Sequence, residues 1–234
     1  MSPPEACLVD VYETILTCDF GRLRSELPAL AGVPERAWHR ELTARGPALS
    51  DGRLSTAAAF AQILQALNVT PRPGLLERLV RRDRELLRAS ARLFDDAIWF
   101  LESLRHRNIK IAIVSNCRDN TRSLLTELGV AALADVLVLS CEAGYAKPAP
   151  QVYQQALDQL GVAAETSVFV DDQVPYCAGA AAAGITAIQI TRPGGPAPGP
   201  AGSAPSPGPH DAQLARVASL REAAALIWPA APRS

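Results

Sequence analysis

Apolar residues in this chain gather into short uninterrupted runs, separated by segments that contain polar residues or glycine. Runs that are continuous rather than alternating are typical of strands buried on both faces of a parallel sheet. The last run is weaker than the others but keeps the same character. We therefore predict strands at residues 6–9, 109–114, 135–139, 167–170 and 185–190.

Segments with helical spacing of apolar residues lie between most of these strands. They cover 95–107, 118–129 and 148–161, and the last two end on a glycine suited to stop a helix. Strands that alternate with helices in this way predict an α/β fold, with a doubly wound, Rossmann-like parallel sheet.

A long insertion separates the first two predicted strands and contains no convincing strand. Three segments within it read as helices, at 34–46, 55–68 and 73–93. We predict that 17–93 form a small all-helical cap that projects over the carboxyl ends of the strands, where ligands bind in open α/β sheets.

The rest of the chain is assigned by exclusion. Residues 1–16 and 94–191, together with 211–228, are predicted to form the α/β core. The stretch 192–210 is rich in proline and glycine, so we predict a flexible loop with no functional role. Helical periodicity returns at 214–227, which we expect to pack back on the core as a helix.

Composition narrows the class of protein further. The 234 residues are 48% hydrophobic and 20% charged with a net charge of −1, so no basic field points to nucleic acid. The first residues lack the features of a signal peptide, and no stretch is long and apolar enough for a membrane span. The five cysteines lack CxxC spacing, so we expect reduced thiols in a cytoplasmic protein; they are Cys7, Cys18, Cys117, Cys141 and Cys177.

Polar side chains follow the predicted strands where those strands end. They are Asp10, Ser115, Asn116, Asp171 and Asp172, and Lys147 stands just before the helix predicted at 148–161. Each alone is an ordinary turn or helix-start residue. Together they converge on one edge of a parallel sheet, where three carboxylates repel one another unless a cation lies among them. Mg²⁺ suits such oxygen ligands, and Lys147 with Ser115 suits a phosphate or another anion.

The order of these residues resembles the haloacid dehalogenase superfamily. The segments that carry the resemblance are DVYETIL at Asp10, Ser115-Asn116, GYAKPAP at Lys147, and VFVDD followed by a glycine- and alanine-rich helix. The resemblance covers roughly 6–190, and the insertion stands where that superfamily places a helical cap.

The resemblance implies a role for each residue. Asp10 would be the nucleophile, and a covalent aspartyl intermediate would later be hydrolysed by water. Mg²⁺ would be held by Asp10, the main-chain carbonyl of Tyr12, and one or both of Asp171 and Asp172. Ser115 and Lys147 would bind the transferring phosphoryl group, and Lys147 would also reduce the effect of the charge on Asp10. Thr14 and Asn116 would support the loops and donate further hydrogen bonds in the substrate-binding site.

Tyr12 departs from the phosphatase pattern. Phosphatases of this superfamily carry a second aspartate at that position, which protonates the leaving group and contributes roughly 10²–10⁴-fold to the rate. Tyrosine is found there in the superfamily's L-2-haloacid dehalogenases, which use no Mg²⁺ and need a cap arginine, for which Arg40 is the nearest candidate. Glu13 is an alternative carboxylate near the site, although it is expected to face outward.

We weigh three functions. The adjacent acids Asp171 and Asp172 are the metal-binding form of the last motif, so a Mg²⁺-dependent phosphatase acting on a small phosphorylated metabolite comes first. An L-2-haloacid dehalogenase and a catalytically impaired protein that binds a phosphorylated ligand remain as alternatives. We expect Trp38, Arg40 and Phe60 of the cap to face the substrate; neither the substrate nor the oligomeric state can be read from the sequence.

Overall fold

The structure, a computed structural model, describes residues 3–70, 72–193 and 214–228. Its centre is a parallel sheet with strand order β5-β4-β1-β6-β7-β8. The strands are β1 (Ala6–Val9), β4 (Lys110–Ser115), β5 (Val136–Leu139), β6 (Ser167–Asp171), β7 (Thr186–Ile190) and β8 (Ala215–Val217). The predicted parallel sheet is confirmed, and the five predicted strands correspond to β1, β4, β5, β6 and β7.

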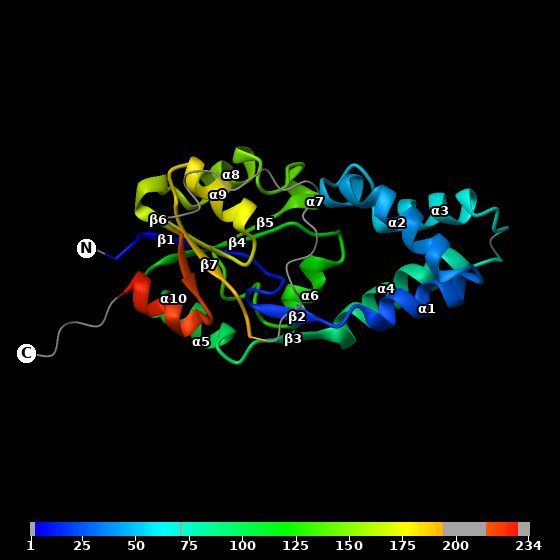
Figure 1. Cartoon of the computed structure of the whole chain (residues 1–234), viewed down its shortest axis with the longest axis horizontal. Helices are drawn as coiled ribbons and strands as arrows, with labels where there is room; N and C mark the ends of the chain where they lie inside the picture. The colour runs from blue at the N-terminus through cyan, green and yellow to red at the C-terminus, as the bar shows by residue number, and fades with distance from the viewer. Residues whose placement is uncertain (1–2, 71, 194–213, 229–234) are drawn as a thin grey trace, which may run out of the picture.

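Helices cover both faces of the sheet (Figure 1). They are α5 (Ala97–His106), α6 (Thr121–Glu127), α7 (Ser140–Ala143), α8 (Pro150–Leu160), the 3₁₀ turn η1 (Ala164–Thr166), α9 (Val174–Ala182) and α10 (Leu220–Ile227). Alternate residues of β1 enter opposite layers: Cys7 and Val9 pack with α5 and α10, and Ala6 and Leu8 pack with α8 and α9. The continuous apolar runs thus reflect burial on both faces.

The tail differs from the prediction in one respect. The helix predicted over 214–227 is only α10, and the residues before it form β8, which pairs with β7 at the sheet edge. A three-residue strand carries too little pattern to be told from the start of a helix. Of the predicted loop 192–210, all but 192–193 lies outside the described residues.

The insertion contains the three predicted helices, together with a fourth helix and a short hairpin that were not predicted. The elements are β2 (Leu16–Cys18), α1 (Gly21–Ala31), α2 (Glu35–Ser50), α3 (Thr56–Ala66), α4 (Leu75–Ser90) and β3 (Ala91–Leu93). The prediction that 17–93 contain no strand was wrong, because β2 and β3 pair antiparallel where the chain enters and leaves the helices. The predicted start of the insertion at residue 17 falls inside β2, whereas its predicted end at residue 93 coincides with the end of β3. The division into two domains stays a prediction.

The four helices lie together at one end of the molecule, beyond the sheet (Figure 1). Trp38 and Phe60 are fully buried between them, with ring centroids 5.2 Å apart. They form the apolar centre of the helices, so the expectation that they face the substrate was wrong. None of the helices in the described ranges has the length and apolar character needed to cross a lipid bilayer.

The inserted helices are fastened to the loop that follows β4. The Thr56 backbone N–H and hydroxyl donate to the carboxylate of Asp119, at 3.0 and 2.5 Å. The amide of Asn120 donates to the buried carboxylate of Asp83 at 2.6 Å. Gly52, in the turn after α2, lies so close to α7 that a Cβ there would be 1.9 Å from a backbone oxygen.

We expect the substitution Gly52→Ala to destabilise the protein more than Gly32→Ala does. Both glycines have left-handed φ, of +74° and +71°, but a Cβ at Gly32 meets nothing within 4 Å. Alanine in that conformation costs about 1–2 kcal/mol at either position, and at Gly52 it also collides with the carbonyl of Cys141. Urea unfolding of the two variants checks this. Equal losses would mean that the close approach of Gly52 does not constrain the fold.

Candidate active site

Strand register brings the first two carboxylates together. β1 pairs with β6 so that Val9 stands opposite Val170, and the next residue on each strand is an aspartate. The Asp10 N–H donates to the Val170 carbonyl at 3.0 Å, which continues the ladder one step past the strand. Asp10 and Asp171 are therefore neighbours at the carboxyl edge of the sheet, as the sequence predicts.

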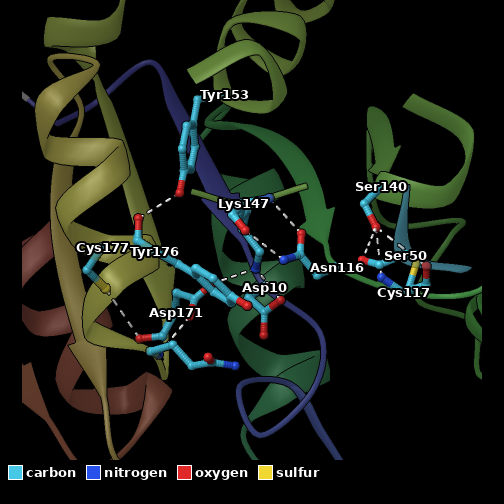
Figure 2. Close-up of polar contacts among 11 residues, drawn as sticks. Asp10, Ser50, Asn116, Cys117, Ser140, Lys147, Tyr153, Asp171, Tyr176 and Cys177 are labelled. Carbon is cyan, nitrogen blue, oxygen red and sulfur yellow. Dashed lines mark hydrogen bonds and ion pairs between the residues drawn. The ribbon is translucent and has the colours of Figure 1, made fainter. Parts of the chain in front are cut away.

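Lys147 bridges these two aspartates. Its side chain is fully buried, and Nζ lies 2.5 Å from Asp10 Oδ1 and 2.5 Å from Asp171 Oδ2 (Figure 2). Burial alone would lower the pKa of Lys147, but the charges of Asp10 and Asp171 outweigh it and hold the pKa above its ordinary value. The rings of Phe169 and Tyr176 also flank Nζ, with centroids 5.4 and 5.0 Å away. Lys147 therefore carries a permanent positive charge within the cluster.

The carboxylates nevertheless outnumber this cation. Asp10, Asp171 and Asp172 each offer an oxygen within 4.8 Å of the others. Burial, assisted by the charge of Asp10, raises the pKa of Asp171 to about 6, although Lys147 opposes the shift. Burial and the charges of Asp10 and Asp171 raise the pKa of Asp172 to about 8. The site thus holds more negative charge than its protein groups neutralise.

This donor set fits a hard divalent cation. All three side chains present carboxylate oxygens, which Mg²⁺ prefers, and their clustering without a second cation among the described residues gives such an ion an electrostatic reason to bind. Asp10, Asp171 and Asp172 are the residues that would hold it. The predicted contribution of the Tyr12 carbonyl stays a prediction.

Two hydroxyls at the site are buried without a partner. Within the described residues, neither Ser115 Oγ nor Thr14 Oγ1 makes a hydrogen bond, although both residues are fully buried. Ser115 ends β4, next to β1 in the sheet. An unpaired buried hydroxyl costs about 1–3 kcal/mol, so each of these two hydroxyls lacks a hydrogen-bond partner at a cost in stability.

Asn116 holds the loop that carries Lys147. Its Nδ2 donates to the Lys147 carbonyl at 2.9 Å, and its Oδ1 accepts from the Lys147 N–H at 2.7 Å (Figure 2). This two-way bond fixes the backbone of Lys147 relative to β4. The sequence predicted a supporting role for Asn116, and the structure places it in contact with that loop.

Tyr12 and Glu13 lie beside the cluster but point to other partners. The Tyr12 hydroxyl is 3.0 Å from Thr121 Oγ1, and burial raises its pKa above the ordinary value. Glu13 accepts from the Thr17 hydroxyl at 2.8 Å, and its φ is +58°. Neither side chain pairs with Asp10. The contacts of Tyr12 and Glu13 therefore do not place either of them in the role of the second aspartate that phosphatases carry at position 12.

The structure does not bring Arg40 to the other predicted residues. Its side chain is 71% exposed and lies 3.4 Å from Glu41, because this part of α2 faces solvent. Arg118 instead borders a crevice of about 370 Å³ between α2 and the loop after β4, which Asn116 also lines. Its Nη2 is 3.2 Å from Asp83, and Nη1 has no partner among the described residues. Arg118 was not among the predicted site residues, although it stands only three residues after Ser115.

Arg192 is a second residue that the sequence analysis missed. It falls at the start of the stretch predicted to be a loop without function, yet its side chain is almost fully buried. Nη2 donates to the Thr14 carbonyl at 2.6 Å, and Nη1 pairs with Asp96 at 2.8 Å. The guanidinium thus fixes the loop after Asp10. The only sequence signal for this role is that the arginine stands directly before the first proline of that stretch, where the predicted core segment 94–191 ends.

Comparison with known proteins gives a consistent picture. A family model described as a haloacid dehalogenase-like hydrolase matches residues 4–184. A phosphatase of Mycobacterium tuberculosis is 30% identical over 197 residues, which are 81% of this chain and 88% of that protein. An (S)-2-haloacid dehalogenase of Pseudomonas sp. is 29% identical over 204 residues, 82% of this chain and 86% of its own.

A solved structure supports the same fold. An enzyme of this family from Bacteroides thetaiotaomicron, in complex with magnesium and inorganic phosphate, superposes with a TM-score of 0.67 at 15% identity. The match covers 80% of this chain and 94% of that one. The sequence relatives thus include both a phosphatase and a dehalogenase at nearly the same identity.

We expect Mg²⁺ to raise the melting temperature of the protein, and to raise it more at about pH 9 than at about pH 6. Below the pKa of about 8 of Asp172, a proton occupies this carboxyl group and competes with the cation. At about a 100-fold excess over Kd the stabilisation is about 2.7 kcal/mol, or roughly 5–10 °C for a domain of this size. Thermal unfolding with and without Mg²⁺ measures both effects.

The control for this measurement is Asp172→Asn, compared with the exposed substitution Asp158→Asn. The first should reduce the Mg²⁺-dependent shift and remove its pH dependence, and the second should leave both unchanged. A melting temperature that ignores Mg²⁺ at both pH values would mean that the three carboxylates do not bind it.

Proposed function

Because the chain belongs to the haloacid dehalogenase-like hydrolase family, we propose that it is a Mg²⁺-dependent phosphatase that acts on a small phosphorylated metabolite. The observation that carries the proposal is the group of three carboxylates within 4.8 Å of one another, opposed by one buried lysine. A reaction that uses no metal ion would leave the excess negative charge of these carboxylates uncompensated. The metal-bound relative in complex with phosphate is consistent with this proposal.

In this proposal Asp10 is the nucleophile. Lys147 binds Oδ1 of Asp10, which leaves the second carboxylate oxygen to attack phosphorus. The lysine charge also reduces the repulsion between that carboxylate and an incoming phosphate dianion. The unpaired hydroxyls of Ser115 and Thr14 are donors for the phosphoryl oxygens. When bound, the cation supplies further stabilisation of negative charge on the transferring group.

The reaction then has two steps. Attack by Asp10 forms an aspartyl phosphate as the bond to the leaving group breaks, and water hydrolyses that intermediate to regenerate the carboxylate. Tyr12 stands at the position of the missing acid, but its hydroxyl has a raised pKa and is bonded to Thr121, so it is not placed to protonate the leaving group. The substrate therefore needs a leaving group that is stable as an anion, such as an acyl or aryl phosphate.

The crevice beside Asn116 offers room for that leaving group. Leu42 and Leu49 of α2 form its apolar side, and Arg118 brings a positive charge to its edge. The crevice therefore suits a small organic group of mixed character.

A haloacid dehalogenase is the second candidate, and Tyr12 with the Pseudomonas relative favours it. Against it stand the paired acids Asp171 and Asp172, which carry more charge than metal-free chemistry needs, and the solvent-exposed position of Arg40. A protein that binds a phosphorylated ligand without turnover is the third candidate, supported by the lack of an acid at position 12.

The first experiment measures anion release by the purified protein with and without Mg²⁺. The substrates are acetyl phosphate, p-nitrophenyl phosphate and L-2-chloropropionate, and Asp10→Asn is the blank. We expect phosphate release that requires Mg²⁺ and falls by on the order of 10³-fold or more when Asp10 is replaced. Chloride release that is indifferent to Mg²⁺ would overturn the proposal in favour of the dehalogenase.

The substitution Tyr12→Asp tests the missing acid. We expect it to raise hydrolysis of an alkyl phosphate such as glycerol phosphate by up to about 10²-fold, because a positioned acid matters most for a poor leaving group. Acetyl phosphate should respond little, and Tyr12→Phe should reproduce the wild-type preference. A protein that binds Mg²⁺ yet turns over no ester in any of these forms would favour the binding protein.

A further inference from the structure

Two cysteines lie side by side at the edge of the sheet, close to the proposed active site. β4 and β5 are parallel neighbours with Ser115 opposite Leu139, and a cysteine stands two residues beyond each of these partners. The sulfur atoms of Cys117 and Cys141 are 3.9 Å apart. Neighbouring strands are about 4.8 Å apart, within the range that a disulfide can span.

The two thiols differ in their surroundings. Cys117 is buried, whereas Cys141 is partly exposed at the start of α7. The hydrogen bond between the two thiols lowers the pKa of Cys141, while the same bond and burial raise the pKa of Cys117. Since the thiolate is the reactive form, Cys141 is the one that meets an oxidant first and Cys117 is its resolving partner.

Both cysteines lie on segments that fasten the site and the inserted helices. Cys117 directly follows Asn116, which holds the Lys147 backbone from both sides. The carbonyl of Cys141 is the atom that Gly52 approaches most closely. Figure 2 shows Cys117 beside Ser140 and Ser50, and the Ser140 hydroxyl accepts from the Cys117 N–H at 2.9 Å. A change at the sulfur pair therefore reaches both the Lys147 loop and the turn after α2.

We propose that Cys141 and Cys117 form a peroxide-reactive dithiol, and that its oxidation to a disulfide lowers the activity of the hydrolase. The oxidant class is a hydroperoxide, with hydrogen peroxide as the probe. The Cys141 thiolate attacks one peroxide oxygen, the O–O bond breaks, and a sulfenic acid and hydroxide form. The Cys117 thiol then attacks that sulfur, the S–O bond breaks and water leaves. Two thiols are oxidised to one disulfide, and one peroxide is reduced to two waters.

The disulfide changes the geometry of the site. An S–S bond is about 2.05 Å long, so the two sulfurs must approach by nearly 2 Å from their present separation. The packing of the Cys141 backbone against Gly52 limits how far α7 moves. The Cys117 loop therefore takes up part of the change, which displaces Asn116 from Lys147. Formation of the disulfide does not depend on the proposed phosphatase function. The predicted loss of activity does depend on that function.

The test treats the full-length protein with hydrogen peroxide, followed by non-reducing peptide mapping and an activity assay with acetyl phosphate. We expect a peptide that links Cys117 with Cys141, and a loss of phosphate release of at least about tenfold that dithiothreitol reverses. Cys117→Ser should stop at a Cys141 sulfenic acid, which dimedone traps. Cys141→Ser should form no linked peptide and resist inactivation. Cys18→Ser, which changes a buried cysteine outside the pair, should behave like the wild type.

The readouts separate the two proposals. If the reduced protein releases no phosphate but the linked peptide forms, the phosphatase proposal fails and the dithiol stands. Absence of the linked peptide, or a linked protein with unchanged activity, overturns the redox proposal. Thermal unfolding of both cysteine variants before oxidation confirms that they are folded, so that a lost linkage reports on the missing thiol.

Discussion

The buried ion triad of Asp10, Lys147 and Asp171 is the interaction on which the rest of this structure depends. All three side chains are almost completely withdrawn from water, and the ammonium group is within hydrogen-bond distance of both carboxylates. Loss of one partner from such a pair leaves an uncompensated charge at a cost of about 3–5 kcal/mol. The strand register that sets Asp10 opposite Asp171, and the amide of Asn116 that fixes the Lys147 loop, are therefore requirements of folding as well as of chemistry.

The triad does not balance itself, and that imbalance links the fold to function. Two carboxylates and one ammonium leave one negative charge, and Asp172 adds another when it ionises. A divalent cation would restore the balance, and a phosphate dianion would then meet a site that is no longer repulsive. Tyr12 does not supply an acid to this site, because its hydroxyl is bonded to Thr121 and its raised pKa makes it a weak proton donor. In the proposed phosphatase, electrostatics would favour phosphoryl binding, whereas the lack of an acid at position 12 would limit the substrates to those with a good leaving group.

The parts of the fold that could be predicted from the sequence are those with a clear pattern of apolar residues, either a continuous run or helical spacing. The strands buried on both faces were recognised because their apolar runs are continuous, and parallel pairing then gathered the strand-end residues. The strands β2, β3 and β8 were missed because three residues carry no usable period. The errors at Trp38 and Arg40 have one cause: the sequence shows which residues are helical but not which face meets another helix. Arg118 escaped notice because only the fold brings it to the crevice.

The five consecutive residues at 116–120 connect these layers. Asn116 holds the Lys147 backbone, the cysteine that follows lies against Cys141, and the next three residues pair with side chains of the inserted helices. Thr56 and Asp83 are the partners on those helices, and both are buried. A shift of the helices relative to the sheet must therefore strain a segment that begins directly after Ser115, the residue proposed to bind phosphate. The segment is short and each of its residues makes a contact, so the inserted helices and the sheet can move little relative to each other without breaking one of these contacts. The Lys147 backbone, the Cys117–Cys141 pair and the inserted helices are thus all contacted by a single loop.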